Sequence, residues 1–314
     1  MKRVLLIAGG GTLGSYTAEE LLRMGCAVDV ICPEEKVSDH PHLRFIRSLA
    51  TEELLRELFA AGKYDGIVNF IHYKTLDEYK RIHPLLIANT DHLIFLSSYR
   101  VYADRMHPIT EEAPRLYDVS EDEEFLATEH YAVPKSKCED YLRGECAGQP
   151  WTIVRPVISF SQYRLDFYIH SEKRVIEYAD RGEKLLVPAT SRYLTAGLDW
   201  AGNSGKLIAH LLFKPHTYGE TYTVSSAQNL TWDEVAQIYR EQIGLEVDWC
   251  SDEDFYERYP YFLEKGKWML DYDRRFDRAI NNEKILKATD LGAGDFKSVA
   301  EGIAIELKKI KGEK

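Results

Sequence analysis

Residues 4–25 read VLLIAGGGTLGSYTAEELLRMG, and this stretch carries the main evidence for the architecture. An apolar run is followed by Gly9, Gly11 and Gly14 in the pattern G-x-G-x-x-G, and then by apolar residues at helical spacing. The glycines permit a tight turn and a close approach of the backbone to a pyrophosphate, which then lies against helix N–H groups. The pattern predicts a strand, a dinucleotide-binding loop and a helix. The strand and helix signals disfavour the alternative, a flexible turn with chance glycines.

The alternation of strand and helix patterns continues to about residue 155. Apolar runs predict strands at 4–8, 27–31, 43–46, 66–70, 93–96 and 151–154. Apolar residues at helical spacing predict intervening helices at 15–24, 51–60, 76–88 and 130–145. Six strands joined by helices predict an α/β fold with a doubly wound parallel sheet of the Rossmann type.

After Arg155-Pro156 this alternation loosens, and the connections become rich in aromatic residues. Capping signals and spacing predict helices at 202–213, at 232–242 behind Thr231 as N-cap, and at 296–307. We therefore expect a dinucleotide-binding Rossmann domain at 1–156 and a smaller α/β substrate-binding part at 157–314. A return of the chain to the Rossmann sheet within the second part is left open.

The charge balance bears on possible partners. Lys and Arg number 40 against 51 Asp and Glu, a net charge of −11 at pH 7. Such a chain repels nucleic-acid backbones and anionic membrane surfaces, and no basic patch offsets this in the sequence. No stretch approaches the roughly 18 apolar residues of a membrane-spanning helix. We expect neither a nucleic-acid nor a membrane partner.

Cysteine and histidine usage bears on compartment and metals. The five cysteines are an odd number without C-x-x-C spacing, which indicates reduced thiols in the cytoplasm. The N-terminal apolar run is interrupted at Gly9, too early for a signal-peptide core. His, Cys, Asp and Glu nowhere have the spacing of a metal site, so no metal is expected.

Two further segments suggest proton-transfer chemistry. Residues 92–102, HLIFLSSYRVY, place Ser98 at the carboxyl end of the fifth predicted strand, where ligands bind in open α/β sheets. Residues 131–142, YAVPKSKCEDYL, place Tyr131 and Lys135 one helical turn apart. A phenol with an ordinary pKa of about 10 is a poor base near neutrality. A nearby ammonium and a positive nicotinamide ring would stabilise its anion, and a serine hydroxyl would hydrogen-bond the reacting oxygen.

The order and spacing of these segments resemble the extended short-chain dehydrogenases/reductases of the NAD-dependent epimerase/dehydratase family. The matching segments are LLIAGGGTLG, YDGIVNFI, SSYRVY, YAVPKSKCEDYL, WTIVRP and the C-terminal NNEKILKATDLG. The resemblance spans most of the chain and is strongest through residue 156. It implies that Ser98, Tyr131 and Lys135 are catalytic, with Tyr131 as acid/base and Lys135 binding the cofactor ribose.

The resemblance also implies the binding residues. Substrate would contact Ser98 and Tyr99. Independently of the resemblance, Arg164 lies on the loop after Arg155-Pro156, where a guanidinium group could bind a substrate diphosphate. An NAD cofactor is favoured, because the acidic Glu34 and Glu35 follow the second strand before the first cation, but NADP is not excluded. A homodimer formed through helices 76–88 and 130–145 is implied by resemblance alone. The cofactor would contact Gly9, Gly11, Thr12, Leu13, Gly14, Cys32, Phe70, Ile71, Tyr131, Lys135 and Pro156.

The sequence departs from the family pattern at three places. Ala8 and Ala103 replace glycines, changes that we expect to leave cofactor binding intact. The segment RPVISFSQYR lacks the Y-G-P-G run expected after Arg-Pro, so a sugar or nucleotide sugar as substrate is an extrapolation from the family.

The sequence leaves several functions open. Tyr99 and Arg100 stand where sugar-nucleotide dehydratases carry Asp-Glu, which favours a reaction that keeps every substrate oxygen. The leading hypothesis is an epimerase that acts by transient hydride transfer, and the second is a reductase of a keto-sugar or another carbonyl. A non-catalytic dinucleotide-binding protein is disfavoured by the intact Ser-Tyr-Lys set, and an RNA-binding relative by the net charge.

Overall fold

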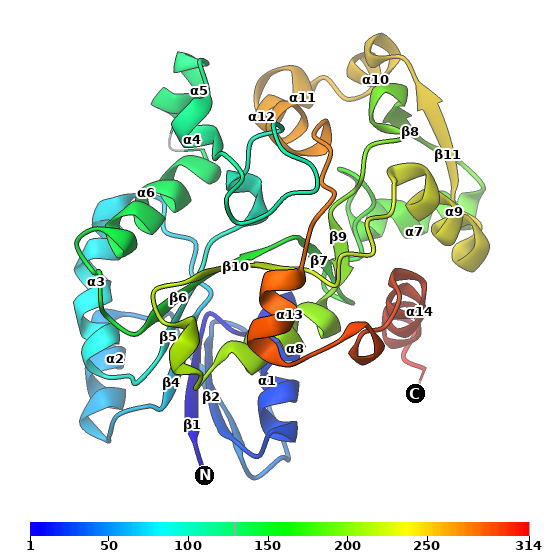
Figure 1. The fold of residues 1–314 in the computed structure, drawn as a ribbon. Coiled ribbons are helices and arrows are strands. Elements are labelled where there is room, and N and C mark those ends of the chain that lie inside the picture. Colours follow the sequence, from blue (N-terminus) through cyan, green and yellow to red (C-terminus); the bar gives the residue numbers. More distant parts are fainter. Residues whose placement is uncertain (129, 314) are drawn as a thin grey trace.

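A parallel sheet of seven strands lies at the centre of the computed structural model, which describes residues 1–128 and 130–313 (Figure 1). The strand order is β10-β6-β5-β4-β1-β2-β3, and every pairing is parallel. The chain thus leaves β1 in one direction and returns to its other side at β4, the arrangement of a doubly wound sheet. The strands are β1 (Arg3–Ile7), β2 (Ala27–Cys32), β3 (Leu43–Arg47), β4 (Gly66–Asn69), β5 (Leu93–Leu96), β6 (Trp151–Pro156) and β10 (Thr221–Val224).

Helices cover both faces of this sheet (Figure 1). One apolar core joins the sheet to α1 (Thr12–Arg23), α8 (Ala201–Leu211) and α13 (Glu283–Thr289). A second core joins the other face to α2 (Glu52–Ala60), α3 (Leu76–Ala88) and α6 (Ala132–Arg143). Both faces are therefore buried, which explains why the strands are almost continuously apolar.

The rest of the chain packs around a separate apolar core above the carboxyl ends of the strands. It contains two small parallel sheets, β8 (Lys184–Pro188) with β11 (Glu246–Cys250) and β7 (Ile158–Phe160) with β9 (Leu198–Trp200). The longer helices are α7 (Glu172–Arg181), α9 (Trp232–Ile243), α10 (Asp252–Arg258) and α14 (Val299–Ile310). Short helical segments are η1 (Tyr99–Val101), α4 (Leu116–Val119), α5 (Glu123–Ala127), η2 (Ala189–Ser191), η3 (Pro215–Thr217), α11 (Tyr261–Glu264), α12 (Lys267–Met269), η4 (Leu270–Arg274) and η5 (Ala293–Asp295).

The predicted Rossmann fold is confirmed, and each predicted strand and helix is found within a few residues of its expected bounds. The last helix begins at Val299 rather than near 296, because Ser298 and Glu301 form a capping box there. The sheet has a seventh strand, β10, which pairs with β6. Residues beyond 156 thus contribute to the Rossmann sheet, while a functional division of the chain at 156 stays a prediction.

The turn after β1 brings the backbone of the glycine loop against the start of α1. A Cβ atom added at Gly14 would lie 2.2 Å from the Gly9 carbonyl oxygen, so only glycine fits there. Ala8 has a φ of 56°, in the left-handed region that favours glycine. This conformation explains why glycine is expected at position 8, which composition alone does not show.

Two further findings concern membranes and metals. In the part of the chain that the structure describes, every helix is too short or too polar to span a bilayer. Within residues 1–128 and 130–313, no three His, Cys, Asp or Glu side chains are grouped so that they could hold a metal ion.

The conformation of Ala8 yields a stability prediction. Ala8→Gly should raise the free energy of unfolding by about 0.5–1 kcal/mol, because the strain of a left-handed alanine is removed. The matched control is Ala61→Gly, since Ala61 is also exposed but has a φ of −79°. That control should lower stability, and urea unfolding measures both. A loss of stability in Ala8→Gly equal to that of the control would contradict the assignment of strain.

Candidate functional site

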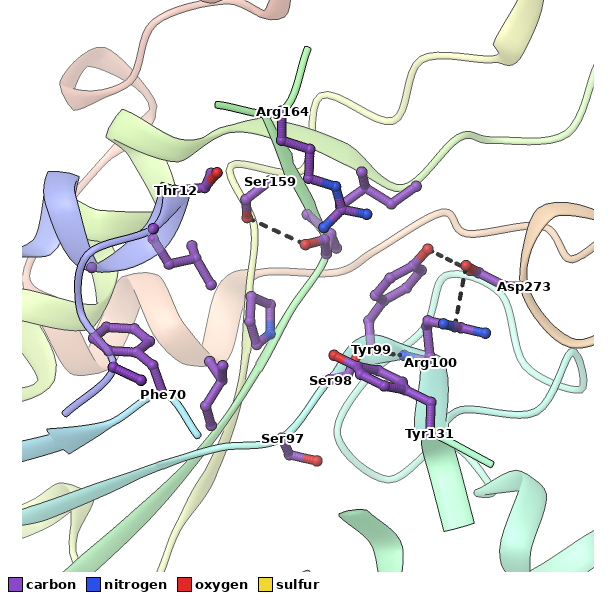
Figure 2. Close-up of a pocket in the computed structure, with 18 of the residues that line it drawn as sticks. Thr12, Phe70, Ser97, Ser98, Tyr99, Arg100, Tyr131, Ser159, Arg164 and Asp273 are labelled. Carbon is purple, nitrogen blue, oxygen red and sulfur yellow. Dashed lines mark hydrogen bonds and ion pairs between the residues drawn. The ribbon is translucent and has the colours of Figure 1, made fainter. Parts of the chain in front are cut away.

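A cavity of about 330 Å³ opens at the carboxyl ends of the central strands (Figure 2). This is the edge where the chain reverses direction between β1 and β4, and ligands of doubly wound sheets bind at such a point. Its walls come from the glycine loop, the ends of β4, β5 and β6, and the distant segment near η4. The lining residues are Ala8, Gly11, Thr12, Leu13, Gly14, Phe70, Leu96, Ser97, Ser98, Tyr99, Arg100, Tyr131, Pro156, Val157, Ile158, Ser159, Arg164, Met269, Asp273 and Arg274.

One end of the cavity is built for a phosphate group. A Cβ atom at Gly11 would meet no atom within 4 Å, so this glycine leaves open space beside the loop. No side chain caps the start of α1, and its first turn has no acidic residue. The N–H groups at this positive helix end are thus available to an anion. The residues present therefore fit the pyrophosphate of a dinucleotide.

The region after β2 contains an acidic side chain close to the glycine loop. A Cβ atom at Gly10 would lie 2.7 Å from Glu34 Oε2, so the Glu34 carboxylate borders the loop. Cys32, at the family's acidic position, is buried under the same glycine. The nearest cation, Lys36, donates to the Gly10 carbonyl oxygen and lies over the Tyr163 ring. Glu34, two residues beyond the expected position, therefore faces the region of an adenosine ribose.

The other end of the cavity brings together the three predicted catalytic residues. Ser98 lies just after β5 and caps η1, where its hydroxyl oxygen accepts a hydrogen bond from the Arg100 N–H at 3.2 Å. Tyr131 is the N-cap of α6, because the helix begins at Ala132 rather than 130. Lys135 is buried, and its Nζ donates to the Leu96 carbonyl oxygen at 2.7 Å and lies 5.3 Å from the Tyr131 ring centroid.

The helix that carries Lys135 starts where the sequence allows it. Pro134 lies in the first turn of α6, where a missing N–H breaks no helical hydrogen bond. Lys135 follows directly, so its side chain extends from the first turns toward the end of β5. The Tyr131 ring also contacts the ring of His72, with centroids 4.8 Å apart.

A cluster of charged side chains adjoins this catalytic end. Asp273 is buried and accepts a hydrogen bond from the Tyr99 hydroxyl. Its carboxylate forms ion pairs with Arg274 and, at 3.2 Å, with Arg100. Burial alone would raise the pKa of Asp273, but the neighbouring arginines, Arg274 first, lower it below its usual range. Asp273 is therefore held as a carboxylate.

The structure brings most of the predicted site residues to this cavity and leaves a few away from its walls. Gly11, Thr12, Leu13, Gly14, Phe70, Ser98, Tyr99, Tyr131, Pro156 and Arg164 line it. Gly9 and Cys32 lie behind the loop, and Lys135 lies beneath Tyr131. Ile71 lines a different hollow, between α2 and α3.

Sequence reasoning missed several residues in or beside the site, among them Asp273, Met269, His72 and Arg100. Asp273 and Met269 reach the cavity from a segment that has no recognised motif, about 140 residues beyond Tyr131. His72 follows β4 and had no partner that the sequence could indicate. Only Arg100 was detectable, because it lies within the SSYRVY segment.

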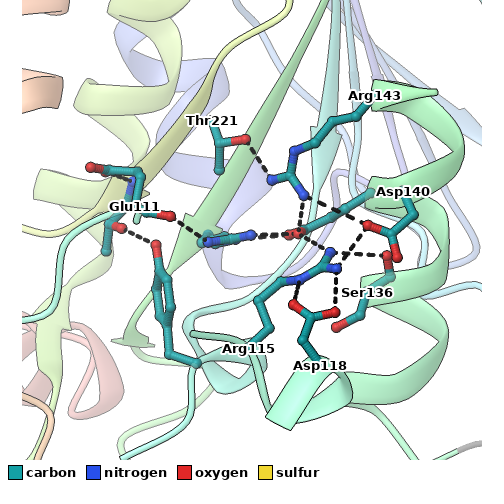
Figure 3. Close-up of polar contacts among 11 residues, drawn as sticks. Glu111, Arg115, Asp118, Ser136, Asp140, Arg143 and Thr221 are labelled. Atoms are coloured by element: carbon teal, nitrogen blue, oxygen red, sulfur yellow. Dashed lines mark hydrogen bonds and ion pairs between the residues drawn. The ribbon is translucent and has the colours of Figure 1, made fainter. Parts of the chain in front are cut away.

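A buried ion-pair network fixes the position of α6 (Figure 3). Glu139 is fully buried and receives Arg155 Nε from β6 at 2.8 Å. Arg115 and Arg143 reach its other oxygen at 3.2 and 3.3 Å. Burial alone would raise the pKa of Glu139, but Arg155 foremost lowers it to about 2. Glu139 lies one turn beyond Lys135, so the network holds the face of α6 that carries Lys135.

No family model and no curated protein matches the sequence. Among solved structures, the epimerase Mth375 of Methanothermobacter thermautotrophicus has a TM-score of 0.71 at 16% identity, covering 99% of this chain and 92% of its own. UDP-glucose 4-epimerase of Thermotoga maritima, solved with UDP-glucose, has a TM-score of 0.69 at 13% identity, covering 99% of both chains.

A third similar structure contains two ligands. UDP-glucuronic acid 4-epimerase of Bacillus cereus, in complex with UDP-glucuronic acid and NAD, has a TM-score of 0.69 at 14% identity and covers 99% of both chains. This chain has the fold of these epimerases. The similarity extends over the Rossmann sheet and the C-terminal part alike, because the aligned regions cover nearly the whole chain.

The Glu139 network yields a second stability prediction. Glu139→Gln should lower the free energy of unfolding by about 3–5 kcal/mol at pH 7, because it leaves buried guanidinium groups without their carboxylate. Asp118→Asn is the matched control, since Asp118 pairs with Arg115 at the surface and should cost less than about 1 kcal/mol. Urea unfolding of both variants measures the difference, and equal losses would contradict the role of Glu139.

The same variant has a pH signature. The pKa of Glu139 is lowered on folding, so its contribution is complete above about pH 4.5 and is lost as pH falls toward 2. Wild type should lose about 3 kcal/mol more than Glu139→Gln across this window.

Proposed function

We propose that the protein is an NAD-dependent epimerase of the extended short-chain dehydrogenase/reductase type, acting on a sugar or nucleotide sugar. One observation carries the proposal: Ser98 and Tyr131 line one end of a cavity whose other end is the glycine loop, and Lys135 Nζ lies 5.3 Å from the Tyr131 ring centroid. The fold shared with epimerases, two of them solved with NAD, supports it.

The glycine loop and the start of α1 would hold the pyrophosphate, and Glu34 the adenosine ribose. Bound NAD supplies a reversible acceptor for the hydrogen and electron pair of a substrate carbon. Phe70, Leu96 and Pro156 form an apolar part of the wall between the loop and the catalytic end.

The chain's own residues account for proton transfer. Tyr131 takes the proton of the substrate hydroxyl, while Ser98 hydrogen-bonds the same oxygen. The Lys135 ammonium, 5.3 Å from the Tyr131 ring, and the Arg100 guanidinium, 4.8 Å from it, stabilise negative charge as it develops on the phenol. After the oxidised sugar has turned so that the opposite face of the carbon meets the cofactor, reversal of these steps returns the proton.

Elimination of water is disfavoured by the same site. Asp273 is the one carboxylate among the described residues that line the cavity, and Tyr99 and Arg274 already occupy its oxygens. With its pKa lowered it has no proton to give to a leaving hydroxyl. An epimerase therefore fits better than a dehydratase. A carbonyl reductase would use the same three residues and is the second candidate.

We further propose that the enzyme acts in the cytoplasm as a homodimer. All five cysteines are free thiols, as a reducing compartment would keep them. Helices α3 and α6 lie side by side on one flank of the sheet, where a second copy could add two helices to form a four-helix bundle (Figure 1).

The catalytic assignment is tested with Tyr131→Phe. Removing the only hydroxyl proposed to carry the proton should lower kcat at least about a thousandfold while leaving the NAD dissociation constant within about threefold. Tyr163→Phe is the matched control, because Tyr163 lies outside the catalytic end and is about half exposed. Epimerisation of UDP-sugars in the presence of NAD is followed by proton NMR, because the two epimers have the same mass. Activity of Tyr131→Phe near that of wild type would refute the assignment.

Cofactor choice is tested with Glu34→Ala. The Glu34 carboxylate would repel a 2′-phosphate, so wild type should bind NAD more tightly than NADP, and the variant should lose about tenfold of this preference. Glu35→Ala is the control, since Glu35 points to solvent and pairs with Arg47. Calorimetry gives both affinities, and an unchanged NAD-to-NADP ratio in Glu34→Ala would exclude this role.

A further inference from the structure

Three guanidinium groups surround a single buried carboxylate beside the catalytic residues. Arg100, Arg274 and Arg278 each pair with Asp273, and Arg274 and Arg278 are at most 5% exposed. Burying charge without a partner is costly, so an excess of cations in such a site indicates a missing anion. The protein as a whole has a net negative charge, so this local excess of cations differs from the rest of the chain.

Arg100 is the arginine placed to meet that anion. It lies two residues after Ser98, lines the cavity, and has its guanidinium carbon 4.8 Å from the Tyr131 ring centroid. Asp273 Oδ2 lies 3.2 Å from its Nε in an ion pair, although this buried nitrogen makes no hydrogen bond. Among the described residues, no side chain or carbonyl group accepts a hydrogen bond from its two terminal nitrogens.

Arg274 and Arg278 already donate hydrogen bonds to backbone carbonyl oxygens. Arg278 donates to the carbonyl oxygens of Tyr102 and Tyr272, and Arg274 donates to that of Tyr168. The Arg278 bonds link the η4 segment to the serine loop (residues 97–102), and the Arg274 bond links it to Tyr168, so that Asp273 is held beside Arg100. The arrangement therefore orients Arg100 as a preformed donor rather than a flexible surface side chain.

We propose that Arg100 binds a carboxylate carried by the substrate's reacting ring, next to the carbon whose hydroxyl Tyr131 deprotonates. The terminal nitrogens of a guanidinium present parallel donors that match a carboxylate. The contact with Tyr131 places this anion at the reacting sugar rather than at a distant diphosphate. The positive charge also affects His130. Burial, and after it the charge of Arg100, lowers the pKa of His130 to about 4. This inference rests on the proposed function and specifies its substrate class.

The test compares two probes that differ only at one carbon, UDP-glucuronate and UDP-glucose. Calorimetry on NAD-loaded wild type should show at least tenfold tighter binding of UDP-glucuronate, as expected for a charge-assisted hydrogen-bonded pair. Arg100→Met should weaken UDP-glucuronate about tenfold to a hundredfold and leave UDP-glucose within about threefold. Arg100→Lys, which keeps the charge, should retain part of the preference.

Arg105→Met is the matched control, since Arg105 is exposed and bonds only the Val119 carbonyl oxygen. It should bind both probes as wild type does. Equal affinity of wild type for the two probes would overturn the proposal, as would an equal weakening of both by Arg100→Met. NAD affinity is measured separately for each protein. If wild type does not bind NAD, the proposed function is contradicted. If it binds NAD but does not prefer UDP-glucuronate, only the proposed role of Arg100 is contradicted.

Discussion

The buried pairing of Glu139 with Arg155 is the constraint on which the site depends. It joins α6 to β6, and Lys135 one turn earlier on α6 reaches the end of β5. The carboxylate lies among three guanidinium groups, and its removal leaves that of Arg155 buried without an ion-pair partner. Such an interaction adds little net stability compared with an apolar core, but it restrains the rotation of α6 about its own axis. The resulting orientation brings Lys135 beneath Tyr131.

A second charged cluster acts on the opposite wall of the cavity. Asp273 draws Tyr99 and Arg100 from the serine loop toward the C-terminal segment, so the two halves of the chain meet at the catalytic end. The protein as a whole is acidic, yet cations outnumber carboxylates at this point. A net negative chain with a local positive pocket favours the approach of small anions to that pocket.

The departures from the family pattern have structural consequences of different kinds. Ala8 keeps a left-handed conformation that glycine would adopt without strain. Cys32 leaves the usual acidic position apolar, and Glu34 brings a carboxylate to the loop from two residues further on. Arg100, where dehydratases carry an acid, changes the charge beside the reacting oxygen. The change at Ala8 bears on stability, whereas the changes at Cys32 and Arg100 bear on the proposed ligands.

Local patterns were sufficient for the fold, and together with the family resemblance they pointed to about half of the residues that line the cavity. The apolar runs, the Gly9-to-Gly14 spacing and the Ser98, Tyr131 and Lys135 positions depend on short-range geometry, which a sequence displays directly. The seventh strand β10, Glu34 over Gly10, and Asp273 beneath Arg100 could not be predicted in the same way. Asp273 and Arg100 lie 173 positions apart and meet only through packing of the C-terminal segment. Because a charge pair has no periodicity, its partners become apparent only when the chain has folded.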